Sequence, residues 1–138
     1  MFDHCLYFNS AAMARLGERE WAAAYAKFDL TPPQGFVIRV VLAHPGCLSS
    51  EIAELLGISR PTATRLIDNL CEKGLVERCQ GKADGREWRI EPTKEGKLIG
   101  PPLNEASAVI AKTLRQKIGS TLFEATVKNM RAVRKVLD

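Results

Sequence analysis

The side chains of this sequence that are best placed for chemistry are hydroxyl, amide and guanidinium groups between residues 60 and 69. This segment contains Arg60, Thr62, Thr64, Arg65 and Asn69, with small or apolar residues between them. If the apolar residues face a core, these five polar side chains must face outward on the opposite side of a helix. A short, polar and basic helix face suits hydrogen bonding to base edges and phosphates in the major groove of DNA.

A tight turn before this segment would position it. Gly57 follows a helical run at residues 51–56 that Ser49 is expected to cap, and a glycine there can adopt the left-handed conformation that ends a helix. Ser59 can accept a backbone N–H at the start of the next helix, and Pro61 suits the first turn. The apolar positions spaced to meet between the two helices are Ile52, Leu56, Ile58, Ala63 and Leu66. An ordinary helical hairpin is the simpler alternative, but the glycine and the apolar register together favour a helix-turn-helix.

Within the predicted second helix, Thr64 and Arg65 are the best candidates for base contacts, because an arginine can donate two hydrogen bonds to guanine. Ser59 and Thr62 suit either phosphate binding or helix capping, and the sequence leaves the two roles open. Asp68 stands three residues after Arg65, so the spacing predicts an ion pair between them on the helix surface.

After residue 74 the apolar pattern changes to that of β-strands. Residues 75–79 and 87–91 flank a polar loop that contains glycine, which predicts a β-hairpin, or wing. Trp88 and Ile90 alternate with charged residues, so one face of the hairpin is expected to pack and the other to be solvated. A merely solvated hairpin is the alternative, and it is less favoured because this hairpin directly follows a helix-turn-helix.

The loop of the predicted wing carries charges that suit DNA. Lys82 and Arg86 are suited to phosphates, or to an arginine inserted in a narrow minor groove. Asp84 can hold the Arg86 guanidinium in an extended pose through a paired hydrogen bond. The candidate DNA-binding residues of the chain are therefore Ser49, Ser59, Arg60, Pro61, Thr62, Thr64, Arg65, Lys82, Asp84 and Arg86.

Amphipathic helices are predicted on both sides of this unit, so the expected fold class is mainly α with a small β-hairpin wing. Residues 5–28 carry two apolar stripes, more than a small domain covers alone, and a partner subunit is the expected cover. Thr31 is placed to cap a helix that starts at two prolines, and Thr93 to cap a later one. Gly100-Pro101-Pro102 is expected to kink or break that later helix. The amphipathic runs that follow are residues 103–117 and 121–137.

The composition is that of one ordinary globular domain, with 138 residues of which 46% are hydrophobic and 26% charged. The net charge of +4 does not locate a DNA site, because seven basic and only two acidic side chains lie in residues 112–138. No apolar run reaches membrane-spanning length and no signal peptide is recognisable, so we expect a cytoplasmic protein with reduced cysteines and no membrane partner. The sequence lacks phosphate-binding loops, nucleophile elbows and clustered metal ligands, which argues against an enzyme, a cofactor or a metal site.

The order of these elements and their motifs resemble the MarR family of winged-helix transcription regulators. The most similar stretch is LSSEIAELLGISRPTATRLIDNLCEKGLVER, from Leu48 to Arg78, followed by Asp84-Gly85-Arg86 and Pro92-Thr93-Lys94-Glu95-Gly96. The resemblance implies a single MarR-like domain with dimerisation helices at about residues 1–30 and 103–138 and a DNA-binding lobe at about residues 31–92. It also implies a homodimeric repressor on a pseudo-palindromic operator of double-stranded DNA, with recognition helices about 34–36 Å apart.

The resemblance further implies release of the operator by a small aromatic ligand, bound between the dimer helices and the lobe, or by oxidation of a cysteine. Cys5 stands beside His4 and Tyr7 and is similar to the N-terminal cysteine region of the family's organic-peroxide sensors, so it is the candidate redox-sensing residue. A buried cysteine without such a role is the simpler interpretation. The alternative function is a winged helix that binds another protein without binding DNA, against which the basic face at residues 60–69 argues.

Overall fold

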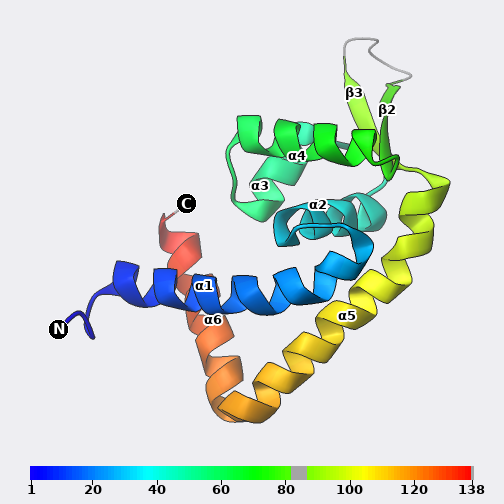
Figure 1. Cartoon of the computed structure of the whole chain (residues 1–138). Helices are drawn as coiled ribbons and strands as arrows, with labels where there is room; N and C mark the ends of the chain where they lie inside the picture. The colour runs from blue at the N-terminus through cyan, green and yellow to red at the C-terminus, as the bar shows by residue number, and fades with distance from the viewer. Residues whose placement is uncertain (82–86, 138) are drawn as a thin grey trace.

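Helices make up most of the chain, and a small antiparallel sheet completes it (Figure 1). The structure is a computed structural model that describes residues 1–81 and 87–137. Its elements in chain order are α1 (Leu6–Tyr25), the short 3-10 helix η1 (Ala26–Phe28), α2 (Pro32–Ala43), β1 (Cys47–Leu48), α3 (Ser49–Leu56), α4 (Arg60–Glu72), β2 (Val76–Gln80), β3 (Trp88–Pro92), α5 (Lys94–Ile118) and α6 (Ser120–Leu137). The fold is mainly α with a small wing, as the sequence predicts.

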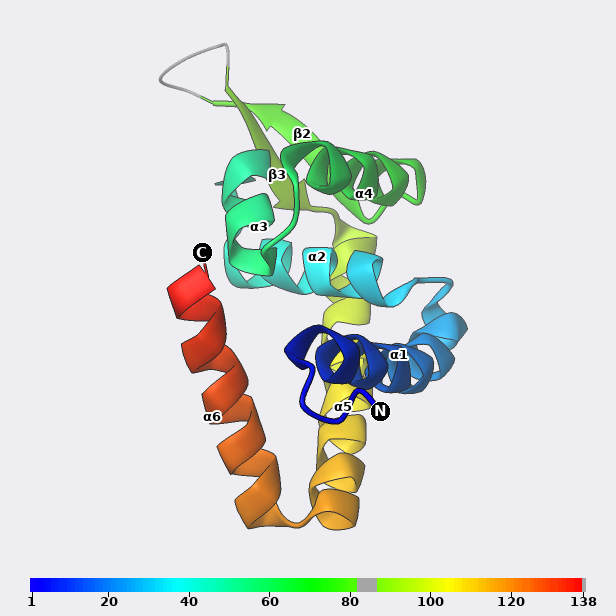
Figure 2. The same cartoon turned by 90° about the vertical axis from the view of Figure 1, so that its left-hand side faces the viewer.

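Helix α2 is the centre of the lobe that contains α3, α4 and the sheet (Figures 1 and 2). It begins where the sequence predicts, because Thr31 and Gln34 form a capping box. The Gln34 side chain accepts the Thr31 backbone N–H at 3.0 Å, and the Thr31 hydroxyl accepts the Gln34 backbone N–H at 3.5 Å. The large side chains that are fully buried around α2 include Val37, Ile38, Val41, Ile52, Ile67, Leu70, Ile90 and Leu103.

The sheet has three strands in the order β1-β3-β2, and both pairs are antiparallel. The hairpin strands begin and end one residue later than the alternation predicts. Strand β1 was not predicted, since its two residues are too few for a period of two to be visible. It pairs Cys47 with Ile90 and Leu48 with Arg89, so the wing is hydrogen-bonded to the residues that directly precede α3.

Helix α5 runs without interruption through Pro101 and Pro102, so a break at Gly100-Pro101-Pro102 is contradicted. The buried face of α5 continues across the prolines from Gly100 to Leu103 and Ala106, and this packing compensates for the backbone hydrogen bonds that the two prolines cannot make. Gly100 contributes a close approach, because a Cβ at that position would lie 2.9 Å from a methyl carbon of Leu42 on α2.

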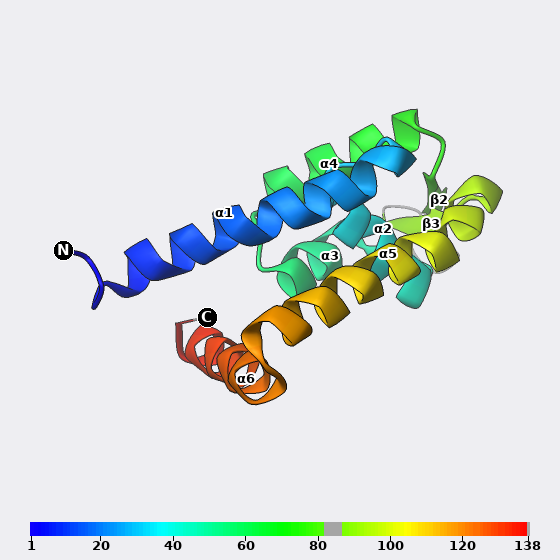
Figure 3. The same cartoon turned by 60° about the horizontal axis from the view of Figure 1, so that its bottom comes forward.

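The first and last helices leave large apolar side chains exposed. Helices α5 and α6 form the two arms of a V that closes at Gly119 (Figures 1 and 2), and α1 packs against α5. Figure 3 shows the same helices from below. None of the described residues of α6 is buried within this chain. The exposed large apolar residues of α1 and α6 include Leu6, Met13, Leu16, Leu122, Val127, Met130, Val133 and Leu137. Among the helices that the structure describes, none is long and apolar enough to cross a membrane.

Candidate nucleic-acid interface

The turn between α3 and α4 has the geometry that the sequence predicts. Gly57 has φ 63° and ψ 40°, the left-handed conformation that a glycine adopts without strain. The Ile58 N–H then donates to the carbonyl of Ala53 at 3.0 Å, which satisfies one of the last carbonyls of α3. Ile58 is half-buried against the core, so the turn that joins the two helices is anchored to the lobe.

The first turn of α4 is fixed by hydroxyl groups. The Ser59 hydroxyl accepts the Thr62 backbone N–H at 3.2 Å, and the two hydroxyl oxygens lie 2.8 Å apart. Ser59 is therefore the N-cap of α4, with Pro61 in the first turn. The Thr64 hydroxyl donates to the Arg60 carbonyl at 3.0 Å, so both lone pairs of its oxygen are left to accept hydrogen bonds.

One face of α4 is polar and exposed, and the opposite face is buried. Arg60, Pro61, Thr64 and Arg65 are exposed, and Thr62 is half-buried. The buried residues of the same helix are Ala63, Leu66, Ile67 and Leu70. The structure thus brings six of the candidate DNA-binding residues, 59–62, 64 and 65, onto one turn and the helix face that follows it.

The predicted pair between Asp68 and Arg65 is contradicted. The Asp68 carboxylate instead pairs with the Arg78 guanidinium of β2 at 2.5 Å. A second ion pair joins Lys73, at the end of α4, to Asp29 at 2.6 Å. Both pairs tie α4 to neighbouring elements, and within the described part of the chain the Arg65 guanidinium forms no hydrogen bond or ion pair. The spacing rule failed because it considers only partners on the same helix.

Ser49 has a different role from the one predicted. Leu48 is the N-cap of α3, and Ser49 is the first residue of the helix and is half-buried. The Glu51 carboxylate accepts the Leu48 backbone N–H at 2.7 Å, which is half of a capping box, since a leucine side chain cannot complete it. The sequence does contain a signal for this N-cap, a glutamate three residues after Leu48. The adjacent Ser49 is a more common N-cap residue, and the prediction therefore chose it.

The wing projects past α4 (Figures 1 and 2), and its apolar alternation is only partly used for packing. Ile90 is buried, but the predicted packing of Trp88 is wrong, because that side chain is 51% exposed. The Arg89 guanidinium on the other face donates to the Gly46 carbonyl at 3.0 Å and lies 3.5 Å from the Glu87 carboxylate. The candidates Lys82, Asp84 and Arg86 lie outside the described residues.

The four cysteines differ in exposure. Cys5 is the N-cap of α1, where its sulfur accepts the Phe8 backbone N–H at 3.5 Å, and it is exposed, so the interpretation of Cys5 as a buried residue is wrong. Cys79 is also exposed. Burial raises the pKa of the Cys47 thiol, and the nearby Glu51 carboxylate raises it further. Burial likewise raises the pKa of the Cys71 thiol, which disfavours its thiolate form.

A groove between the lobe and α5 was not found from the sequence. It has a volume of about 510 Å³, and its lining includes Phe36, Arg39 and Asn104. The Arg39 Nε donates to the Asn104 side chain at 2.8 Å, and its Nη1 donates to the Ser107 hydroxyl at 3.1 Å. The Ser107 hydroxyl also bonds the buried hydroxyl of Tyr25. This network joins α1, α2 and α5, and it orients a guanidinium over the Phe36 ring at the edge of the groove. No local motif reveals it, because its members are up to 82 residues apart.

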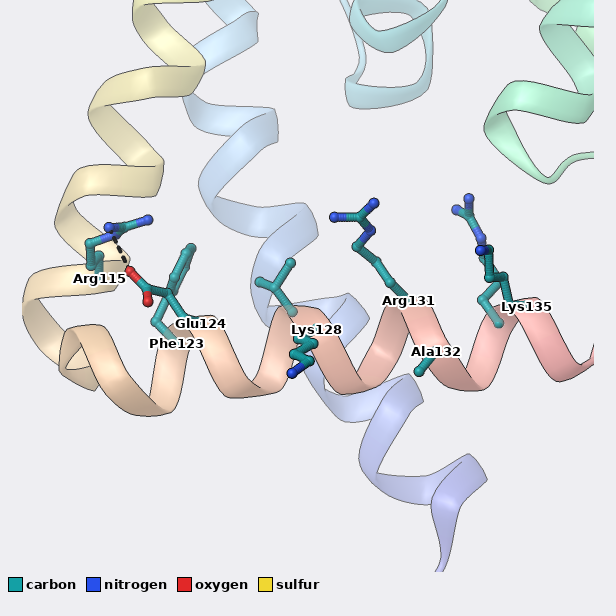
Figure 4. Close-up of a pocket in the computed structure, with 9 residues that line it drawn as sticks. Arg115, Phe123, Glu124, Lys128, Arg131, Ala132 and Lys135 are labelled. Carbon is teal, nitrogen blue, oxygen red and sulfur yellow. Dashed lines mark hydrogen bonds and ion pairs between the residues drawn. The ribbon is translucent and has the colours of Figure 1, made fainter.

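A second groove of about 470 Å³ follows the inner face of α6 (Figure 4). The labelled Arg131 and Lys135 point into the space between α6 and the lobe. Arg115 on α5 pairs with Glu124 at 3.0 Å at the closed end of the V. Most of the excess positive charge of the chain therefore lies along this groove and not on α4.

Comparisons with known proteins agree with this architecture. Residues 28–87 match the model of the MarR family. A curated relative, the uncharacterized HTH-type transcriptional regulator YfiV of Bacillus subtilis (strain 168), is 27% identical over 96% of this chain and 81% of its own length. The fold is similar to that of S. aureus MepR in a complex with DNA, with a TM-score of 0.85, 21% identity and full coverage of both chains. It is also similar to the transcriptional repressor CouR bound to p-coumaroyl-CoA, with a TM-score of 0.87, 22% identity and coverage of 96% of this chain and 94% of CouR. In the sequence of residues 28–87 and in its fold across nearly its whole length, this chain is therefore similar to the MarR family of winged-helix transcription regulators.

Proposed function

We propose that this regulator is a homodimeric repressor that binds a pseudo-palindromic operator in double-stranded DNA. The observation that carries the proposal is the outward face of α4. It combines exposed hydroxyl and guanidinium groups with a buried opposite face, and ion pairs from Asp68 and Lys73 fix the C-terminal half of the helix to neighbouring elements. A rigid helix with an unpaired arginine is what reading of base edges requires. Ser49, half-buried at the start of α3, is the candidate with the least support as a direct contact.

The homodimer is supported by the exposed apolar residues of α1, α5 and α6. A helix with no buried residue gains little stability from packing in its own chain, so a second copy is the expected cover. The dimer would comprise helices at about residues 1–30 and 103–138 and would place two lobes, about residues 31–92, on one side. Two α4 helices about 34–36 Å apart would then fit successive major grooves.

We propose that the effector is a small aromatic anion bound in the groove beside Phe36 and Arg39. The Phe36 ring offers a stacking surface, and Arg39 offers a positive charge whose bonds to Asn104 and Ser107 use Nε and Nη1. The second terminal nitrogen of the guanidinium then remains to bind a carboxylate. The repressor CouR, which has a similar fold, binds the aromatic acyl-CoA p-coumaroyl-CoA, and this is consistent with an aromatic effector here.

Oxidation of Cys5 is the other candidate switch, and its support is the exposure of the thiol at the start of α1. The two switches are separable in one assay. Peroxide would release DNA from the wild type but not from Cys5→Ser, whereas an aromatic acid would release DNA from both. Loss of binding by Cys5→Ser in peroxide would exclude Cys5 as the sensor.

The test of the main proposal is DNA protection mapping upstream of the chain's own gene, combined with binding at several salt concentrations. A protected inverted repeat, and an affinity that falls steeply with salt because counterions are released from phosphates, would support it. The alternative, a winged helix that binds another protein, predicts no protected repeat and a nearly flat salt dependence.

A further inference from the structure

The wing exposes a large aromatic side chain, Trp88. The chain has two tryptophans, and they are in different environments. Trp21 on α1 is half-buried, with its ring centroid 6.4 Å from that of Phe36. Trp88 at the start of β3 is 51% exposed, although an indole is among the side chains that gain most from burial.

Strand register shows which face of the wing Trp88 occupies. Gln80 is its partner on β2, and Arg78 is the partner of Ile90, so all four side chains lie on the same face of the hairpin. Ile90 on this face is buried under the helices, and Arg78 pairs with Asp68 of α4. Trp88 is two residues beyond Ile90, about 7 Å further along the strand. It therefore lies on the α4 side of the wing, just past the end of the core.

The described arginines of the wing are already bonded to the protein. Arg78 pairs with Asp68, and Arg89 bonds the Gly46 carbonyl on the opposite face. Among the described wing residues, Trp88 is thus the large side chain that combines an apolar surface with an N–H donor on the side of the exposed α4 face. If α4 lies in a major groove, the neighbouring sugar-phosphate backbone runs past this side of the wing.

We propose that Trp88 is a DNA-contact residue whose indole packs against the deoxyribose backbone beside the groove that α4 occupies. The inference rests on the proposed operator binding and assigns a residue to it. Contacts to sugar and phosphate carry no sequence information, so Trp88 contributes to affinity equally on the operator and on other duplexes.

Tryptophan fluorescence tests the contact directly. In a Trp21→Phe variant the only tryptophan emission comes from Trp88, and this replacement removes no hydrogen bond to the described residues, because the Trp21 indole nitrogen is buried without a partner among them. We expect a random-sequence duplex of about 30 base pairs at low salt to shift the Trp88 emission and to protect it from acrylamide quenching, since a duplex of that length can contact both lobes of the proposed dimer. A duplex that binds without changing either signal would overturn the inference while leaving operator binding intact.

Affinity measurements provide the second arm. Trp88→Ala is expected to weaken binding roughly tenfold on the operator and on random duplex alike, and Trp88→Phe to recover most of the loss, because the ring supplies the apolar contact. A loss confined to the operator, or no loss, would contradict the proposal. An emission shift that depends on protein concentration without DNA would assign the face to contact between copies instead. If no duplex binds to the wild type, the proposed function fails together with this inference.

Discussion

At the scale of single residues, the proposed reading of DNA depends on which guanidinium groups are already paired. Arg78, Arg89 and Arg39 donate to protein groups, whereas the described surroundings of Arg65 offer it no partner. A long cation without a protein partner keeps its donors for an incoming base, and α4 fixes the position from which it extends. Arg65 is therefore the residue whose replacement should change specificity most.

Replacement of Arg65 by Ala is expected to weaken operator binding by roughly 1–3 kcal/mol and to relax the preference at one base pair, because two hydrogen bonds to a guanine are lost. Arg65→Lys keeps the charge but not the planar fork, so it should retain affinity for random duplex and still lose the base preference. Mobility-shift titrations on the operator and on random DNA measure both effects. Wild-type affinity and preference in both variants would exclude Arg65 from base reading.

At the scale of elements, α2 holds the lobe and the first helix together through a very close approach. A Cβ built on Gly35 would overlap the ring of Tyr25, which is fully buried at the end of α1. The Tyr25 hydroxyl in turn bonds Ser107 of α5. One glycine on α2 thus lets a tyrosine connect the helices of the expected dimer unit to the lobe.

Two glycine-to-alanine replacements should therefore have opposite effects on stability. Gly35→Ala is expected to lower the free energy of unfolding by about 1–3 kcal/mol, because the Tyr25 ring has to move out of a close-packed site. Gly17→Ala on α1 is the matched control, since a Cβ there meets nothing within 4 Å, and it should raise the free energy of unfolding by roughly 0.5–1 kcal/mol. Urea unfolding of both variants provides the comparison, and equal stabilities would contradict the packing argument.

At the scale of the whole molecule, α6 is the helix whose apolar side chains are least buried within its own chain. It has no buried residue, yet it carries six exposed large apolar side chains and lies opposite α5 across the V (Figure 2). The arrangement is understandable if a second copy covers α6 and sets the distance between two lobes.

A charge placed on this apolar surface should prevent formation of the proposed dimer. Leu122→Glu is expected to shift the protein to monomer and to weaken operator binding, since one lobe alone would bind a half-site. Thr121→Glu places the same charge at an exposed neighbour that is polar already, and it should remain dimeric. Sedimentation equilibrium distinguishes the variants. A dimeric Leu122→Glu protein, or a monomeric wild type, would exclude this interface.

Features that local rules govern could be predicted from the sequence, whereas features set by distant partners could not. The left-handed Gly57, the Ser59 cap and the Thr31 capping box depend on a few consecutive residues. The Asp68–Arg78 pair, the continuity of α5 through its prolines and the exposure of Trp88 depend on packing between elements. The Arg39 network joins residues of three helices, so the sequence offered no signal for the groove beside it.

The pairing of Leu48 with Arg89 has a consequence for the spacing of the operator itself. With the neighbouring Cys47–Ile90 pair it joins the wing to the N-cap of α3, and α3 packs directly on α4. The wing and α4, the two parts of the lobe that would approach DNA, are thus held together through α3. The distance between the DNA contacts of the wing and those of α4 is therefore expected to be fixed. An operator with one extra base pair between its major-groove and backbone contacts would be longer there by about 3.4 Å and turned about its axis. One lobe could then no longer make both sets of contacts.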